Sequence, residues 1–350
     1  MKPGSVKIVD LSGEEMSTYQ PPYTITPEIL NRVAAISEAI GRLTVLTDQA
    51  RALRLRRINR IRTIHGSLAI EGNTLSEAQI TAILEGKRVI APPREVQEVK
   101  NALAAYDRFD SWKPEAEKDL LEAHRILMSG LIDEAGIYRH GGVGVMAGQQ
   151  VIHMARPADR VPQLMADLYG WLAATDAHPL IASSVFHYEF EFIHPFTDGN
   201  GRMGRLWQGL VLARWNPLFA DIPVESLIFE HQAEYYQAIQ ESTQQTDSAP
   251  FISFMLRMIL DTVNASTPEV ALDVTPEVRL LSVLTGKMTR QQLKEALGLK
   301  DDEHFRKAYL LPALDAGLIE MTIPDKPRSS KQKYRLTDKG RQRLAQFGGG

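Results

Sequence analysis

The 350-residue sequence contains no cysteine and no long apolar run. Without thiols the chain can form neither disulfides nor thiolate metal sites. No segment approaches the roughly 20 apolar residues that span a bilayer. The charged start, Met-Lys-Pro-Gly-Ser-Val-Lys, is followed by no apolar core of the kind found in signal peptides. The simplest expectation is a cytoplasmic protein without a membrane partner.

Patterns typical of strands are also scarce, whereas apolar residues recur at helical spacing along most of the chain. A first helix should begin at Thr26-Pro27-Glu28, where a cap residue precedes a proline at the first helical position. The arginine-rich segment 51–62 keeps helical spacing and is expected to be a solvated helix face rather than a nucleic-acid patch. Further helices are predicted at 75–85, 94–110, 114–130, 160–174, 178–192, 202–215, 229–244 and 250–264. The fold class is therefore mainly α.

One segment departs from the helical pattern. Val143 and Val145 alternate with smaller residues, and a Gly-Gln-Gln turn then leads into Val151 and Ile152. Alternating apolar residues around a short turn predict a β-hairpin, here over about 141–156.

The C-terminal part has a different organisation. A helix that ends at Gly298, a second helix over 301–316, a strand, the basic loop 324–333 and a returning strand at Tyr334 resemble a winged helix-turn-helix. Residues 271–350 carry 15 Lys and Arg against 10 Asp and Glu, so the wing could contact DNA phosphates. Many such modules bind proteins or dimerise instead, and both alternatives stay open. The predicted organisation is an arm and helix (1–59), a catalytic domain (60–265), a linker (266–276), a winged-helix-like domain (277–345) and a disordered tail (346–350).

The most informative stretch is His-Pro-Phe-Thr-Asp-Gly-Asn-Gly-Arg-Met-Gly-Arg at residues 194–205. His194 is a base that titrates near neutral pH, and Asp198 offers the hard oxygen that Mg²⁺ prefers. Gly199 and Gly201 allow a close approach of backbone N–H groups to an anion. Two arginines three residues apart would share a face at the positive end of a helix. The chemistry suits a proton acceptor beside a metal-held polyphosphate.

This stretch resembles the signature of the Fic family, and every fixed position is matched. The resemblance implies a helical Fic fold and an adenylyltransferase, which moves AMP from ATP to a side-chain hydroxyl (Ser, Thr or Tyr) of a target protein. His194 would take the proton from that hydroxyl, and Asp198 would bind Mg²⁺. The remaining nucleotide-binding positions would be Phe196, which anchors the loop, and Gly199, Asn200, Gly201, Arg202 and Arg205 around the phosphates.

A second resemblance lies in residues 63–73. Ser67 and Glu71 are four apart, and Gly72 is a natural helix terminator. They match the family's Ser/Thr-x-x-x-Glu-Gly/Asn element, which implies an autoinhibitory helix at about 62–72. In that reading Glu71 pairs with Arg205 and displaces the γ-phosphate of ATP. The alternative is an ordinary capped helix whose glutamate faces water.

The resemblance also implies two outer parts of the site. The hairpin would be a flap whose residues Val151, Ile152 and His153 hold the target by strand addition. Family flaps often end in Pro-Pro, where this chain has Ala155-Arg156-Pro157. On a later helix Tyr236 would contact adenine, with Thr243 two turns further along, although two aromatics at this spacing are usually core residues. His187 is interpreted as a packed or hydrogen-bonded core histidine.

Other functions stay open at this stage. Members of the family also phosphorylate, transfer phosphocholine or remove AMP, and Glu71 could orient a water for AMP removal. AutoAMPylation and a homodimer are compatible with the sequence. From a different class, the chain could be a DNA-binding regulator that acts through 277–345 and senses nucleotide with its Fic domain.

Overall fold

The computed structural model describes residues 19–46, 49–142, 144–147, 150–272, 276–299, 301–326, 329 and 331–348. They form two compact units, the first within 1–40 and 55–263 and the second within 41–54 and 264–350. The predicted mainly α fold is confirmed. In the described residues, no helix combines the length and the apolar character that a membrane crossing requires.

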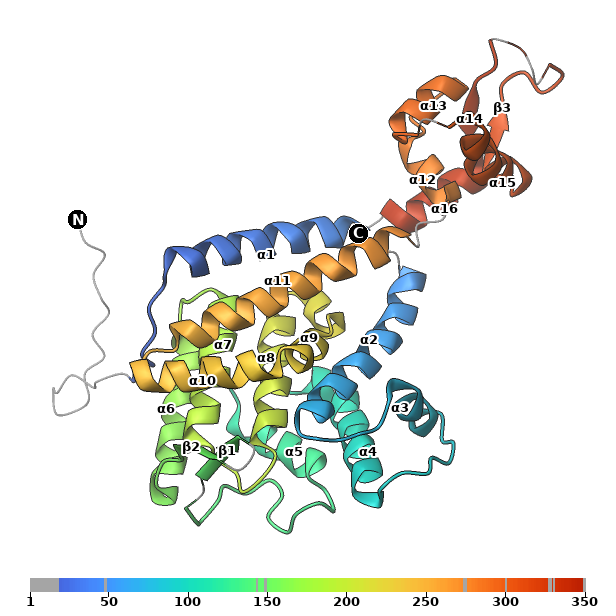
Figure 1. Ribbon diagram of the computed structural model, residues 1–350. Helices are drawn as coiled ribbons and strands as arrows, with labels where there is room; N and C mark the ends of the chain where they lie inside the picture. Colours follow the sequence, from blue (N-terminus) through green and yellow to red (C-terminus); the bar gives the residue numbers. More distant parts are fainter. Residues whose placement is uncertain are drawn as a thin grey trace, which may run out of the picture. The chain divides into compact units, whose positions relative to one another are not determined.

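Figure 1 shows the helices and short helical turns up to residue 272. They are α1 (Pro27–Leu46), α2 (Gln49–Ile70), α3 (Glu77–Leu84), α4 (Pro93–Arg108), η1 (Phe109–Ser111), α5 (Glu117–Leu127), η2 (Ala158–Arg160), α6 (Val161–Ala174), α7 (Pro179–Ile193), α8 (Asn200–Trp215), η3 (Pro217–Asp221), α9 (Val224–Glu230), α10 (Gln232–Gln245) and α11 (Ala249–Leu272).

The helical pair α7 and α8 forms the centre of the first unit. Among the described elements, these two pack against each other most extensively. Helix α7 begins with Pro179 at its first position, and Nδ1 of His178 accepts a hydrogen bond from the N–H of Leu180 at 3.2 Å. Almost every side chain of α7 is buried, because a helix that is apolar all round belongs in a core. The loop between α7 and α8 is therefore held by two buried helices.

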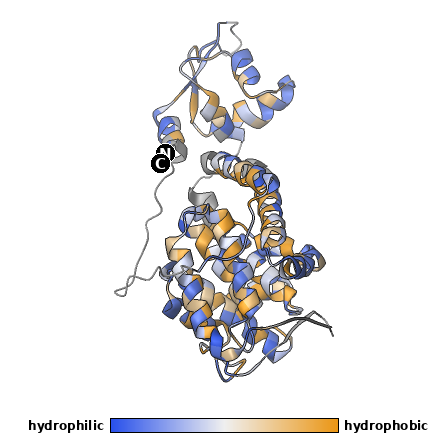
Figure 2. Cartoon of the chain, turned by 90° about the vertical axis from the view of Figure 1, so that its left-hand side faces the viewer, coloured by the Kyte–Doolittle hydropathy of each residue, from blue (hydrophilic) through white to orange (hydrophobic). Residues whose placement is uncertain are grey.

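Polar and apolar residues are mixed along the helices, as the hydropathy colours in Figure 2 illustrate. In α1 the buried stripe contains Val33, Ile36, Ile40 and Leu43, with Ile29 at its start. Leu30 lies three residues before Val33, a helical spacing that predicts a place on this stripe, but it is 62% exposed. Helix α2 ends as predicted: Gly72 has a positive φ of 88°, and the N–H of Asn73 reaches back to the carbonyl of Leu68 at 3.1 Å.

The predicted hairpin is confirmed as strands β1 (Gly144–Ala147) and β2 (Gln150–Met154), which pair antiparallel. The register pairs Val145 with His153 and Met146 with Val151, so Ile152 is an extra residue on β2. Such a bulge bends and twists the strand locally. Val143 and the turn residues Gly148 and Gln149 lie outside the described residues.

The second unit has its own hydrophobic core, which includes Leu280, Leu293, Phe305 and Ile319. Its helices and strands are α12 (Pro276–Val283), α13 (Arg290–Ala296), α14 (Asp302–His304), η4 (Phe305–Leu310), α15 (Leu311–Asp315), β3 (Ile319–Met321), β4 (Tyr334–Leu336) and α16 (Asp338–Gly348). The segments α14, η4 and α15 together make the predicted second helix, and β3 pairs with β4.

Two secondary-structure expectations around this unit need correction. Helix α11 continues through much of the predicted linker 266–276, as far as Leu272. Helix α16 includes residues 346–348 of the predicted disordered tail. Residues of low helix propensity, Pro268 in the first segment and Gly348 in the second, favour a break in the helix, but tertiary context can override such propensities.

Candidate active site

The signature loop, residues 194–199, joins the end of α7 to the start of α8. His194 adopts the left-handed backbone conformation, φ 54° and ψ 63°, and its N–H donates to the carbonyl of Phe190 at 2.9 Å. This conformation costs a non-glycine residue roughly 1–2 kcal/mol, so surrounding contacts must hold it. The imidazole is 16% exposed, and its Nδ1 lies 3.9 Å from Oε2 of Glu191. The predicted base thus sits on a strained, well-packed turn.

Two of the predicted nucleotide-binding residues support the loop from inside. Phe196 is fully buried, in agreement with the expectation that it anchors the loop, and its part in nucleotide binding stays a prediction. The side-chain amide of Asn200 accepts from the N–H of Phe196 and donates to its carbonyl, both at 2.9 Å. These two bonds commit the Asn200 side chain to the loop, which leaves its backbone N–H for a phosphate.

A buried histidine that sequence reasoning missed braces the same loop. The ring of His124 stacks on Phe196 with centroids 3.6 Å apart and planes 5° apart. Its Nδ1 accepts from the N–H of Gly136 at 2.8 Å, so Nε2 carries the proton and donates to the carbonyl of Asp198 at 3.0 Å. Burial lowers the pKa of His124 to about 4. The brace is therefore a neutral imidazole with a fixed tautomer.

The start of α8 is built for an anion. Gly199 caps the helix with a φ of 86°, and the N–H groups of the first turn have no acceptor within the helix. A Cβ added at Gly201 would lie 2.4 Å from Oε1 of Glu71 and 3.0 Å from Nη1 of Arg205. Only glycine allows the two charged groups to approach this turn so closely. The positive end of the helix dipole and the N–H groups of the first turn attract negative charge.

Arg205 is held by the predicted inhibitory segment. Its Nη2 donates to Oε1 of Glu71 at 2.6 Å and to the carbonyl of Ser67 at 2.9 Å, and its Nε donates to Oγ of Ser67 at 3.2 Å. The arginine side chain is 1% exposed and that of Glu71 is 32% exposed. Burial acts to lower the pKa of Arg205, but the neighbouring Glu71 carboxylate outweighs it and the pKa is raised. The structure therefore brings Ser67, Glu71 and Arg205 together.

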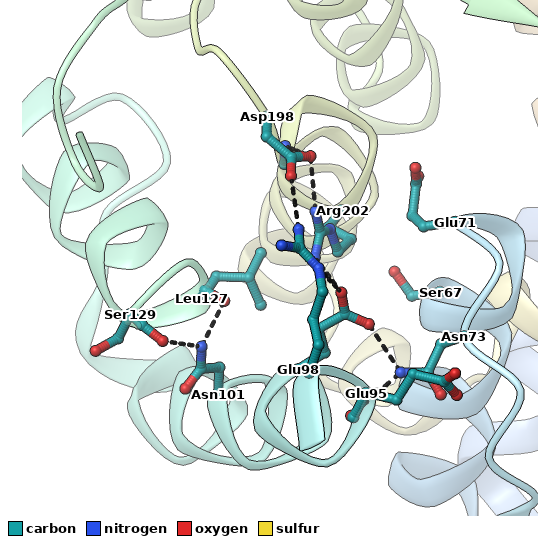
Figure 3. Close-up of polar contacts among 12 residues, drawn as sticks. Ser67, Glu71, Asn73, Glu95, Glu98, Asn101, Leu127, Ser129, Asp198 and Arg202 are labelled. Atoms are coloured by element: carbon teal, nitrogen blue, oxygen red, sulfur yellow. Dashed lines mark hydrogen bonds and ion pairs between the residues drawn. The ribbon is translucent and has the colours of Figure 1, made fainter. Parts of the chain in front are cut away.

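Asp198 and Arg202 belong to a second charged network (Figure 3). Oδ1 of Asp198 accepts from Arg202 at 2.9 Å, and Oδ2 accepts from Arg94 of α4 at 3.3 Å. Glu98, also on α4, lies 3.8 Å from Arg202 and 3.4 Å from Arg94. Its other oxygen accepts from the amide of Asn73 at 2.8 Å. The network connects the start of α8 to the turn that follows Glu71.

The Asp198 carboxylate has the chemistry expected of a magnesium ligand. It is 41% exposed, at the mouth of the site. The described residues contain no group of three His, Asp or Glu side chains that could form a metal site by themselves. One carboxylate is sufficient where nucleotide phosphates supply further oxygens, which is how Mg²⁺ is usually bound with such substrates.

Helix α10 carries two tyrosines with different surroundings. Tyr235 is buried, and its hydroxyl lies 3.1 Å from Nε2 of His187. His187 is fully buried and also bonds Gln208, which confirms it as a core histidine, and burial lowers its pKa to about 3. Tyr236 is half-buried, and burial followed by the charge of Glu71 raises its pKa. Gln232, one turn earlier on the same face of α10, donates to the carbonyl of Ile70 at 2.7 Å, which brings this face next to Glu71.

A cavity of about 660 Å³ lies between α7, the end of α10 and the segment after the flap. Its walls include Thr243, Tyr188, Phe192 and Arg156. The hydroxyls of Tyr188 and Thr243 are 3.2 Å apart, and the guanidinium of Arg156 lies 4.4 Å from the ring centre of Phe192. This cavity provides an aromatic wall with polar groups at its rim, a common arrangement for a small-molecule site.

The predicted flap residues are placed on β2, where Val151 and His153 pair with β1 and Ile152 is the bulged residue. Their role in target binding stays a prediction. Four residues around the signature loop were missed in the sequence, namely Arg94, Glu98, His124 and Arg139. Arg94 and Glu98 show only a common i, i+4 charge pair, and the two others are single residues without a local motif.

Comparison with known proteins agrees with this geometry. Residues 114–212 match the Fic/DOC family, and residues 276–337 match the C-terminal domain of Filamentation induced by cAMP protein Fic-like proteins. A crystal structure of a Fic family protein from Desulfovibrio desulfuricans G20 is 54% identical, with a TM-score of 0.71, over 92% of this chain and 99% of that one. The chain therefore belongs to the Fic family.

Relatives of lower identity include a protein that is named as an adenylyltransferase. A protein adenylyltransferase Fic from Nematostella vectensis is 31% identical over 58% of this chain and 47% of its own length. The chain thus spans about half the length of that relative. The structure of Fic-1 from Caenorhabditis elegans is 26% identical over 70% of this chain and 72% of that chain, with a TM-score of 0.57.

Proposed function

We propose that this chain is a protein adenylyltransferase, which transfers AMP from ATP to a hydroxyl of a target protein. One observation carries the proposal: the loop that begins at His194 leads into the first turn of α8, and that turn lies against the buried Arg205. Among the described residues, Nη1 of Arg205 is a buried donor without a hydrogen-bond partner. A buried guanidinium N–H without an acceptor, next to an anion-binding helix end, is well suited to a phosphate.

The proposed step forms a bond between the target hydroxyl oxygen and the α-phosphorus of ATP. The bond from the α-phosphorus to the bridging oxygen breaks, and pyrophosphate leaves. His194 accepts the hydroxyl proton as general base. Arg202, Arg205 and the N–H groups of α8 stabilise the negative charge on the leaving phosphates. Asp198 would hold Mg²⁺, which neutralises phosphate charge when bound.

The nucleoside has a candidate location along α10. Tyr236 and Thr243 are seven residues apart, so they lie on one face of the helix about 10 Å apart along its axis. Tyr236 is close to the phosphate end through Glu71, and Thr243 lines the cavity beside α7. We infer that adenosine extends along this face and that the flap presents the target beside it by strand addition.

The inhibitory reading of Glu71 rests on the three hydrogen bonds that Arg205 donates to Ser67 and Glu71. A γ-phosphate would need the same guanidinium, and one arginine fork cannot satisfy both anions fully. We infer that Glu71 holds the site in a state that binds ATP poorly for transfer. The exposure of Glu71, 32%, leaves room for it to move away from Arg205.

Two labelled forms of ATP test the proposed reaction. The full chain is incubated with bacterial lysate proteins, Mg²⁺ and ATP labelled on either the α- or the γ-phosphate. AMP transfer leaves label on protein from α-labelled ATP alone. Label from γ-labelled ATP would mean phosphorylation, and no label in either arm, with the Glu71→Gly variant included, would exclude both transfers.

Two alternatives use specific features of the chain. AMP removal would use Glu71 to orient a water, and it predicts that pre-labelled protein loses AMP when the chain is added. A DNA-binding role for 277–345 finds less support, because the helix expected to enter a groove begins with Asp301, Asp302 and Glu303. The basic residues next in that helix, Arg306 and Lys307, pair with Glu303 at 3.7 and 3.2 Å.

A further inference from the structure

Arg139 is a buried arginine outside every motif of the sequence, in the segment between α5 and β1. It is 1% exposed, and within the described residues it forms no ion pair with a carboxylate. Burying a guanidinium without a counter-charge is costly unless its donors are satisfied. Burial accordingly lowers the pKa of Arg139. The hydrogen-bond partners of the guanidinium must therefore offset the cost of its burial.

Its partners are backbone carbonyls on three separate segments. Nε donates to the carbonyl of His194 at 2.7 Å, and Nη2 donates to that of Ile193 at 3.2 Å. Nη1 donates to the carbonyl of Gly141 at 2.8 Å, and Nη2 also donates to the carbonyl of Arg156. The Arg139 N–H adds a bond to the carbonyl of Pro195 at 2.9 Å.

These acceptors fall at functionally distinct places. Ile193 and His194 end α7, where helix carbonyls have no partner within the helix, and His194 has the strained backbone conformation described above. Gly141 lies three residues before β1 begins, and Arg156 lies two residues after β2 ends. One side chain therefore joins the turn that carries the base to both ends of the flap.

We propose that Arg139 is a positioning residue that fixes the target-binding flap relative to His194. The inference rests on the proposed function, because the flap presents the hydroxyl that His194 deprotonates. A shift of about 1 Å between reacting groups can cost a hundredfold in rate. ATP binding should not depend on Arg139, since none of its partners belongs to α8 or to Arg205.

The geometry of arginine makes the inference testable by a conservative change. The guanidinium offers five donors in a rigid planar fork, whereas the lysine ammonium offers three from one point. Arg139→Lys keeps the charge but cannot reach the flap ends and the catalytic turn together. Arg214→Lys is the matched control, because Arg214 also donates to two backbone carbonyls, those of Asp110 and Trp112. It lies at the far end of α8, about 20 Å along the helix from Asn200.

The experiment compares the two variants in the Glu71→Gly background. Thermal unfolding, ATP affinity by calorimetry, self-labelling with α-labelled ATP and amide hydrogen exchange are measured for each. We expect Arg139→Lys to bind ATP within twofold of the control, to label itself at least tenfold more slowly, and to exchange the amides of β1 and β2 at least tenfold faster. Unchanged exchange in β1 and β2, or ATP affinity that falls in step with labelling, would overturn the proposal.

Two further observations distinguish the positioning role of Arg139 from an effect on folding stability and from a failure of the proposed AMP transfer. In the wild-type chain, NMR should show the Nε–H of Arg139 exchanging with water as slowly as core amides, and rapid exchange would contradict the clamp even if the lysine variant failed to fold. If the Glu71→Gly chain transfers no AMP at all, the proposed function fails. The exchange and ATP-binding comparisons then still decide whether Arg139 fixes the flap to the turn.

Discussion

At the scale of single residues, the signature positions could be read from the sequence, but their supports could not. The signature brings a base, a carboxylate and two arginines together within twelve residues of sequence, namely His194, Asp198, Arg202 and Arg205. Each of these side chains is of a type with known catalytic or ligand-binding chemistry. His124 and Arg139 act through backbone atoms of the signature loop, and no local pattern marks a side chain that binds a distant carbonyl. Such contacts depend on the tertiary fold.

The role of His194 is the first test at this scale. We predict that His194→Ala lowers AMP transfer by roughly 10²–10⁴-fold, the usual worth of a general base. ATP affinity should stay the same, because the phosphates are held by α8, Arg202 and Arg205. Labelling rate and ATP calorimetry on the same preparation check this, with the Glu71→Gly background providing a measurable rate. A variant that labels at the parental rate would remove His194 from the mechanism.

Stability should depend on pH through His187. Burial lowers the pKa of His187 to about 3, whereas an unfolded histidine titrates near 6.5. Between these values the unfolded state binds the extra proton, so stability falls as pH decreases, by up to about 1.4 kcal/mol per pH unit. Glu191, Tyr235 and Arg205 also face this ring. Urea unfolding of wild type and His187→Gln at pH 5 and 7 measures this contribution to the free energy of unfolding. An equal change in that free energy between the two pH values for both chains would contradict it.

At the scale of secondary-structure elements, spacing and caps predicted most helices within a few residues. Helix α8 begins at Asn200 instead of 202, because Gly199 supplies a left-handed cap that the Gly-Asn-Gly sequence does not distinguish from a plain turn. Helix α9 was missed, since its seven residues are too few to show periodicity. The link from α4 through Glu98 to Asn73 and Arg202 joins elements distant in sequence and needed the structure.

Two glycine substitutions in α8 distinguish the close approach of charged groups to Gly201 from the general effect of glycine on helix stability. Gly201→Ala should weaken ATP binding about tenfold or more, because its Cβ would meet Glu71 and Arg205 where the phosphate must lie. Gly209→Ala in the same helix is the control, with Phe109 Cζ at 3.9 Å as its nearest atom. That change should instead stabilise the fold by roughly 0.5–1 kcal/mol. Equal ATP affinities in the two variants would show that Gly201 does not border the nucleotide.

At the scale of the whole molecule, the chain combines a Fic domain with a second unit that has its own core. The division into parts followed from composition, but the partner of the second unit did not. We predict that the full chain does not retain a labelled DNA duplex at physiological salt, because Asp301, Asp302 and Glu303 would face the phosphates. A mobility shift that weakens steeply with added salt would show the opposite, since phosphate contacts release counterions.

We propose that Glu71 withholds Arg205 from ATP in an AMP-transfer site. The most direct measurement is the initial rate of labelling from α-labelled ATP, at saturating ATP and Mg²⁺, for wild type, Glu71→Gly and Glu71→Gly with Arg205→Ala. A charged hydrogen bond is worth roughly 1.5–3 kcal/mol, so removing Glu71 should raise the rate about tenfold to a hundredfold, and the second substitution should abolish the gain. Equal rates for wild type and Glu71→Gly would contradict the account.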